Sequence, residues 1–294
     1  MQPICLFCKS YSADLERAAA LVESTRQFNR EALRLVLSVP AKDLNAFKAR
    51  IGTEGVEWLG DEEIVAHTSP DWAKRLAEMP GGLTQQVVKS EFWRLGVAQN
   101  YLCLDSDCLF IRPFGASDFI ASDGHPYSVL HEGKPWRQFC LTHGLGWAIR
   151  ADEAEKSRAR ELFGRSGPIY QFGPLPVIWS AKVWKALADN YLAPKGWSLF
   201  DAIQAHPVEA TWYGEALLAY GAIPIHPREP LFRAYLYLED YEHDRRLGIT
   251  PDIVVRDYLG VVLQSNWYPK RLRPLKSLAY KLKKVLRVMR KQHR

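Results

Sequence analysis

The fold is decided by residues 101–113, which read Tyr-Leu-Cys-Leu-Asp-Ser-Asp-Cys-Leu-Phe-Ile-Arg-Pro. The apolar run 101–104 predicts a buried strand that ends in Asp105 and Asp107. Two carboxylates one residue apart on an extended backbone lie on the same side of the chain. Hard divalent cations, and the diphosphates they carry, prefer such oxygen ligands. The segment therefore predicts a site for a cation and a nucleotide diphosphate.

Upstream of this segment, apolar runs alternate with helical spacings. Strands are predicted at 4–8, 33–39, 56–59 and 64–65, and helices at 14–28, 42–50 and 85–97. Such alternation implies a mostly parallel sheet with helices on both faces. Ligands of these sheets bind beyond the carboxyl ends of the strands, where both Ser10-Tyr11 and the acidic pair fall. The predicted fold class is α/β, with a mostly parallel sheet flanked by helices.

The periodicity weakens after Pro113. Short strands are predicted at 129–131, 144–149, 176–179 and 222–225, and helices at 158–163, 182–191 and 199–205. Because no linker rich in Pro, Gly or Ser separates the halves, we expect one domain over residues 1–268 and a tail over 269–294.

The charge is distributed unevenly along the chain. Residues 270–294 hold eleven of the 39 Lys and Arg residues and no Asp or Glu, so the remainder has 28 basic against 33 acidic residues. The net charge of +6 therefore belongs to the tail. This asymmetry argues against a nucleic-acid-binding core and predicts one anionic partner for the tail.

The tail has the pattern of a basic amphipathic helix. One stripe is apolar: Leu275, Leu278, Leu282, Leu286 and Met289. Lys and Arg occupy the remaining face, which is typical of helices that bind an anionic membrane surface. An RNA-binding tail, and a helix that docks on an acidic partner or on this protein's own body, are the alternatives.

The five cysteines indicate the cellular compartment of the protein rather than a zinc or disulfide site. Their odd number and apolar, strand-like surroundings favour buried free thiols over disulfides or zinc ligands, which suits a reducing cytosol. The first ten residues lack the pattern of a signal peptide, and no apolar run approaches the length of a membrane span. We expect a cytoplasmic protein attached peripherally to the inner face of the plasma membrane.

Residues 85–113 resemble the core of the GT-A nucleotide-sugar glycosyltransferases. The closest similarity is to a bacterial GT-A-like family of unknown function. Members share a Gln-Gln-x-x-Lys helix, a Leu-Asp-Ser-Asp strand end and a following Phe-x-x-Pro. The chain has these residues at 85–89, 104–107 and 110–113.

The resemblance implies a metal-dependent glycosyltransferase. Asp107 would bind Mn²⁺ or Mg²⁺, and Asp105 would bind the donor ribose or a metal-bound water. The implied substrates are a nucleotide-sugar donor, expected to be UDP-linked, and a glycan or lipid-linked acceptor, in the setting of envelope polysaccharide synthesis.

Four further residues are expected at the donor site. Gln85, Gln86 and Lys89 share one helix face and could offer amides and a cation to the nucleotide. The alternative is an ordinary polar face on a packed helix. Lys9, at the end of the first strand, would lie near the nucleobase or be simply solvated.

Two roles rest on residues of the second half. The family's third metal ligand is a late His or Asp; His226 is the main candidate, beside His206 and His243, with a solvated loop histidine as the alternative. Glu215 is the candidate catalytic base, although the related family places its Glu closer to a Tyr-Gly pair than Glu215 is to Tyr220-Gly221.

Other interpretations stay open from the sequence. Trp147, Trp179 and Trp212 could stack on sugars or pack in the core. A metal-dependent nucleotidyltransferase would share the sheet, but residues 9–14 lack the glycines of a phosphate loop. A non-catalytic nucleotide- or sugar-binding protein on the same scaffold is the third interpretation.

Overall fold

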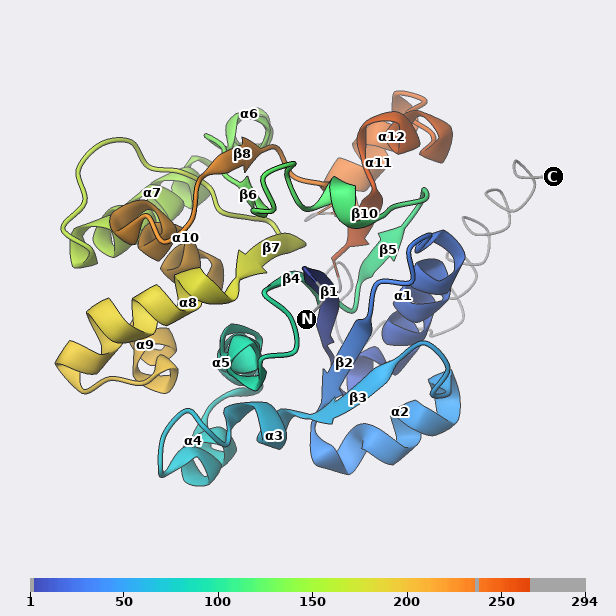
Figure 1. Ribbon diagram of the computed structural model, residues 1–294. Helices are drawn as coiled ribbons and strands as arrows, with labels where there is room; N and C mark the ends of the chain where they lie inside the picture. The colour runs from blue at the N-terminus through green and yellow to red at the C-terminus, as the bar shows by residue number, and fades with distance from the viewer. Residues whose placement is uncertain (1–2, 236–237, 265–294) are drawn as a thin grey trace.

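The computed structural model describes residues 3–235 and 238–264, which form a layered α/β structure (Figure 1). Its main sheet has the strand order β3-β2-β1-β4-β7. These strands are β1 (Ile4–Lys9), β2 (Leu35–Val39), β3 (Glu57–Gly60), β4 (Asn100–Asp105) and β7 (Val177–Ser180). All neighbours pair in parallel except β7, which is antiparallel to β4. The predicted fold class, a mostly parallel sheet flanked by helices, is confirmed.

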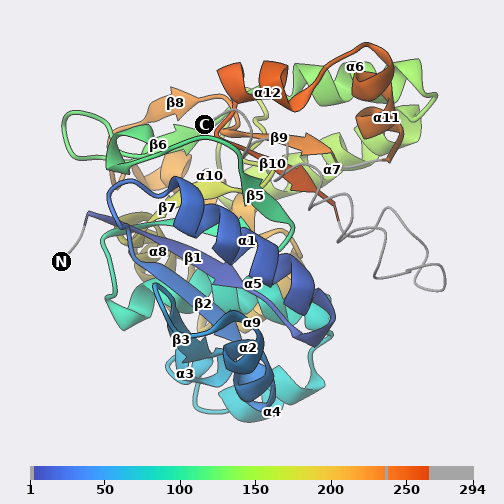
Figure 2. The ribbon, with the colours of Figure 1, turned by 90° about the vertical axis from the view of Figure 1, so that its right-hand side faces the viewer.

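Helices cover both faces of this sheet (Figures 1 and 2). One face packs against α1 (Leu15–Phe28) and α2 (Leu44–Ile51). The other packs against α5 (Gly81–Glu91), α8 (Ala181–Leu187), α9 (Leu199–Ala205) and α10 (Glu209–Tyr220). Since β1 is buried on both faces, its sequence is a continuous apolar run rather than an alternating one.

The side chains of β1 divide between two hydrophobic cores. Leu6 and Cys8 belong to the core under α1 and α2, whereas Cys5 and Phe7 belong to the core under α5 and α10. The two cysteines thus point to opposite faces, as their spacing predicts. All five cysteines are buried free thiols, which confirms that expectation.

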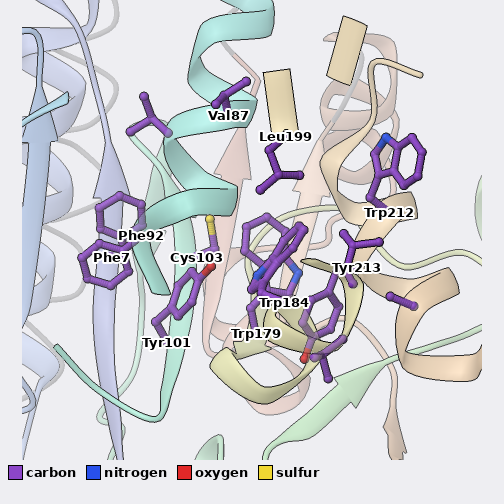
Figure 3. Close-up of a cluster of buried hydrophobic side chains, with 14 of the residues drawn as sticks. Phe7, Val87, Phe92, Tyr101, Cys103, Trp179, Trp184, Leu199, Trp212 and Tyr213 are labelled. Carbon is purple, nitrogen blue, oxygen red and sulfur yellow. The ribbon is translucent and has the colours of Figure 1, made fainter. Parts of the chain in front are cut away.

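The second core is rich in aromatic rings (Figure 3). Phe7 stacks on Phe92 with ring centroids 3.9 Å apart, and Trp179 meets Trp184 edge-on at 5.1 Å. Trp179 and Trp212 are each only 1% exposed, so they pack in the core and do not offer a face to a sugar. Trp147, by contrast, is 65% exposed.

Two smaller sheets complete the described residues. β5 (Cys108–Phe110), β9 (Phe232–Tyr235) and β10 (Gly260–Leu263) form one, with β10 in the middle. β6 (Tyr127–Val129) and β8 (His226–Arg228) form the other. β9 and β10, far along the sequence, therefore return to the strand that follows the acidic pair.

Several predicted elements are wrong or displaced. Residues 64–65 are not a strand but the end of α3 (Asp61–Val65), and within the strand predicted at 144–149 residues 146–149 form the first turn of the helix α7 (Gly146–Leu162). The strand predicted at 222–225 begins only at His226. Five of the described helices have no counterpart among the predicted elements: α4 (Trp72–Glu78), α6 (Lys134–Thr142), α10 (Glu209–Tyr220), α11 (Leu238–Arg246) and α12 (Pro251–Asp257).

None of the helices within 3–235 and 238–264 is long and apolar enough to cross a bilayer. The predicted amphipathic tail lies outside the described residues.

Candidate functional site

The acidic pair lies where the sequence predicts it, at the carboxyl end of β4. Asp105 is the last residue of the strand and stands beside Lys9 of β1 in the sheet register. Its side chain is 34% exposed, although the strand before it is buried. Ser106 follows, and its hydroxyl lies 3.1 Å from that of Ser10 after β1. The carboxyl ends of the two central strands thus meet through polar groups.

Asp107 is held from the other side by β10. It lies in the turn between β4 and β5, and its carbonyl oxygen accepts a hydrogen bond of 3.0 Å from the Leu263 N–H group. Leu263 ends β10, which pairs antiparallel with β5. The position of the Asp107 backbone therefore depends on residues far along the sequence.

Lys89 reaches the acidic pair from α5. Its Nζ lies 2.5 Å from Asp105 Oδ1, and only 3% of its side chain is exposed. The helix is fixed at this point because the Tyr101 hydroxyl of β4 donates a hydrogen bond to the Lys89 carbonyl oxygen. Burial lowers the pKa of Lys89, but the nearby carboxylates outweigh it and raise the pKa well above its usual value. Lys89 is therefore a buried permanent cation, not part of a solvated face.

Glu209 is a site residue that the sequence analysis missed. It is the first residue of α10, and its Oε1 lies 3.4 Å from Lys89 Nζ. Its side chain is 11% exposed. A signal existed, because Glu209 precedes Tyr213-Gly214 by four residues, a shorter interval than that from Glu215 to Tyr220-Gly221.

Lys9 joins a second buried network across the ends of β1, β2 and β3. Its Nζ lies 3.0 Å from Asp61 Oδ2, and the Ser38 hydroxyl donates to the other carboxylate oxygen of Asp61. Burial raises the pKa of Asp61, while Lys9 and Ser38 oppose the rise. Lys9 is thus a paired buried cation rather than a solvated lysine.

Gln85 and Gln86 lie one helical turn before Lys89 and are partly exposed. The Gln86 amide donates a weak hydrogen bond of 3.3 Å to the Gly82 carbonyl of its own helix. Both residues lie on α5, the helix that carries Lys89.

Glu215 does not have the surroundings of a general base. It lies in the middle of α10, is 1% exposed, and accepts hydrogen bonds from Arg165 on both carboxylate oxygens, at 2.6 and 3.1 Å. A buried carboxylate held in this way is paired with the guanidinium and shielded from solvent. Its contacts are those of a buried structural ion pair.

His226 does not join the acidic pair. It lies on β8, and its ring Nε2 is 2.8 Å from Asp123 Oδ2. His206 is buried against Glu155, and His243 belongs to α11. Across residues 3–235 and 238–264, no three His, Cys, Asp or Glu side chains form a group suited to a metal ion. The predicted three-ligand set is therefore not brought together.

The two remaining carboxylates still fit a divalent cation. Mg²⁺ commonly takes only one or two protein carboxylates and fills its other positions with phosphate oxygens and water. Asp105 and Asp107 match this donor set, and the exposed part of Asp105 is open to such an ion. One oxygen of Asp105 is shared with the Lys89 ammonium.

Comparison with protein families gives one match, over residues 2–217, to a family of unknown function (DUF6492). The chain belongs to this family. The match includes the acidic pair, Lys89 and Glu209, and it ends before β8, β9 and β10. No curated protein matches the chain.

Among solved structures, the chain is similar to the apo form of mouse xyloside xylosyltransferase 1. The two are 10% identical, the similarity covers 90% of this chain and 99% of that chain, and the TM-score is 0.48.

Proposed function

We propose that the protein is a metal-dependent glycosyltransferase that moves a sugar from a nucleotide-sugar donor to a glycan or lipid-linked acceptor. One observation carries this proposal: an Asp-Ser-Asp triplet at the carboxyl end of β4 stands beside the polar ends of β1, in a mostly parallel sheet. That edge is where α/β sheets bind nucleotides. The resemblance of residues 85–113 to GT-A enzymes supports the same reaction.

Each site residue has a proposed role that follows from its position. Asp107 and Asp105 hold Mn²⁺ or Mg²⁺, which when bound stabilises negative charge on the departing nucleoside diphosphate. Ser10 and the end of β1 face the same edge, so the nucleoside is expected there. The partly exposed side chains of Gln85 and Gln86 would contact polar groups of the donor.

The basic tail completes the proposal. With eleven Lys and Arg residues and no acids in 270–294, it would hold the enzyme on an anionic membrane, close to a lipid-linked acceptor. The expected location is the cytoplasmic face of the plasma membrane.

The test is the melting temperature of the purified protein with Mn²⁺ and a panel of nucleoside diphosphates and nucleotide sugars. We expect one nucleotide to raise the melting temperature only when Mn²⁺ is present, because binding to the folded state stabilises it. Asp107→Ala and Asp105→Ala should each abolish this increase. Asp107→Ala should keep the melting temperature of the ligand-free protein, whereas Asp105→Ala, which removes the nearer partner of the buried Lys89 ammonium, should lower it. Glu132→Ala, which removes an exposed carboxylate paired with Lys134, is the matched control and should respond like the wild type.

The same measurement, extended to nucleoside triphosphates and sugar phosphates, distinguishes the glycosyltransferase from the two alternative functions. A response to nucleoside triphosphates together with sugar phosphates would indicate a nucleotidyltransferase. A folded protein that responds to no nucleotide would contradict the proposal and favour a non-catalytic scaffold.

A further inference from the structure

The Lys89 ammonium lies between two carboxylates at unequal distances. Asp105 Oδ1 is 2.5 Å away, and Glu209 Oε1 is 3.4 Å away. Because the Lys89 side chain is 3% exposed, water cannot replace a lost partner. A buried ammonium must stay paired, so any movement away from Asp105 has to end at another carboxylate.

The two carboxylates differ in their access to solvent. A third of the Asp105 side chain is exposed, whereas the Glu209 side chain is 11% exposed. A divalent cation that enters from solvent therefore meets Asp105 and not Glu209. Once there, it would share a carboxylate with an ammonium, and two cations on one carboxylate repel each other strongly at this depth.

Glu209 is well suited to be the second partner of this ammonium. As the first residue of α10, it lies at the positive end of the helix dipole. The helix is fixed against the sheet, because the buried Tyr213 hydroxyl accepts a hydrogen bond from the Ser180 N–H group. A shift of Nζ by about half an ångström would give an ordinary ammonium–carboxylate distance.

We infer that Glu209 is a positioning residue that provides an alternative position for the Lys89 ammonium. In the metal-free protein the Lys89 ammonium lies closer to Asp105 than to Glu209. When a divalent cation binds Asp105 and Asp107, the ammonium moves closer to Glu209 and stays buried and paired. The inference rests on the proposed metal site. It assigns to Glu209 the role of freeing Asp105 for the cation.

The experiment measures Mn²⁺ affinity by electron paramagnetic resonance on the full chain, with Mn²⁺ alone as the probe. Glu209→Gln should weaken Mn²⁺ binding about 10-fold, because the ammonium then has only Asp105 as a partner. Lys89→Met removes the competing cation and should bind Mn²⁺ at least as tightly as the wild type. In the Lys89→Met background, Glu209→Gln should change the affinity by less than about 2-fold, since Glu209 acts through Lys89.

Glu91→Gln is the matched control. Glu91 is also fully buried, belongs to the helix that carries Lys89, and pairs with one cation, Arg94. It should leave the Mn²⁺ affinity unchanged. Melting curves of each variant without metal establish that the protein is folded, and Glu209→Asp, which keeps the charge, should recover part of the affinity lost in Glu209→Gln.

The results distinguish the role of Glu209 from the existence of the proposed metal site. If the wild type binds Mn²⁺ and Glu209→Gln binds it equally well, the inference is wrong and the proposed metal site stands. The inference would also be wrong if Glu209→Gln and Glu91→Gln lost the same Mn²⁺ affinity. It would likewise be wrong if Glu209→Gln weakened Mn²⁺ binding in the Lys89→Met background as much as in the wild type. A folded wild type that binds no Mn²⁺ would overturn the metal site and the inference together.

Discussion

Buried charges near the ends of the central strands occur in pairs or triads with precise partners. The Lys9 ammonium pairs with Asp61, and the Lys89 ammonium pairs with Asp105 and Glu209. The Arg165 guanidinium pairs with Glu215. The free energy of removing an ion from water explains this pattern, because a buried charge that loses its partner is strongly destabilising. The identity of each partner therefore decides whether a residue is available to a ligand or committed to the fold.

Lys9→Met should lower the free energy of unfolding by about 3 kcal/mol at pH 7, since Asp61 then has no buried cation. Burial already raises the pKa of Asp61, so the folded state gains relative stability as the pH falls and the carboxyl group becomes neutral. The decrease in the free energy of unfolding caused by Lys9→Met should therefore be smaller at about pH 4 than at pH 7. Urea unfolding at both pH values measures it, and Lys9→Met/Asp61→Asn should recover most of the stability at pH 7. A single variant as stable as the wild type would contradict this account.

At the scale of elements, the strands and helices before residue 113 follow periodicity closely, and the exceptions have local causes. α3 forms where a strand was expected because the Glu63 carboxylate accepts a hydrogen bond of 2.7 Å from the Gly60 N–H group at the helix start. Residues 144–149 are a short apolar run, which periodicity alone cannot assign to a helix or a strand. The tertiary packing around such a run determines whether it forms a helix or a strand.

α9 illustrates how a capping residue can also join two helices. Asp201 accepts a hydrogen bond of 2.7 Å from the Ser198 N–H group and is bound by Arg75 of α4 at 2.5 Å. Burial raises the pKa of Asp201, but the hydrogen bonds from Arg75 and Ser198 outweigh it and lower the pKa from 3.8 to about 2.

Asp201→Asn should therefore lower the free energy of unfolding by about 1–2 kcal/mol at pH 7, allowing for the partial exposure of the pair. A depressed carboxyl pKa stabilises the fold above 3.8, and this stabilisation is lost as the pH falls towards 2. The difference from the wild type in urea unfolding should begin to narrow below about pH 4. A difference that is the same at pH 7 and pH 3 would exclude this linkage.

At the scale of the molecule, the sequence predicts one half of the site better than the other. Asp105, Asp107 and Lys89 come from one continuous segment, where the strand and the helix face are visible in the residue spacing. Glu209 is 120 residues from Lys89, and no local pattern reports which distant carboxylate meets a buried ammonium. The same limit explains why the sequence suggests Glu215 as the catalytic base. Glu215 lies on the same helix as Glu209 but pairs with Arg165.

Charge asymmetry leads to a prediction for the whole chain. Removal of residues 270–294 leaves 28 basic and 33 acidic residues, so the remaining protein should be repelled by an anionic bilayer. Cosedimentation with vesicles that contain anionic lipid should fall to the level seen with neutral vesicles, while the nucleotide response of the melting temperature is kept. Binding to anionic vesicles that survives this deletion would show that the tail is not the membrane contact.

The pairing of β10 with β5 has a consequence for the order in which the protein is made. Val262 lies opposite Cys108 in the register, and Leu263 holds the Asp107 carbonyl, so the acidic turn is complete only after residues 260–263, far beyond Asp107 in the sequence, have been synthesised. The nascent chain would emerge with this edge of the sheet unfinished and would complete it only when β10 has been made. A shortened gene that stops where the family match stops, at residue 217, would encode every carboxylate of the proposed site yet lack the strand that fixes one of them in place.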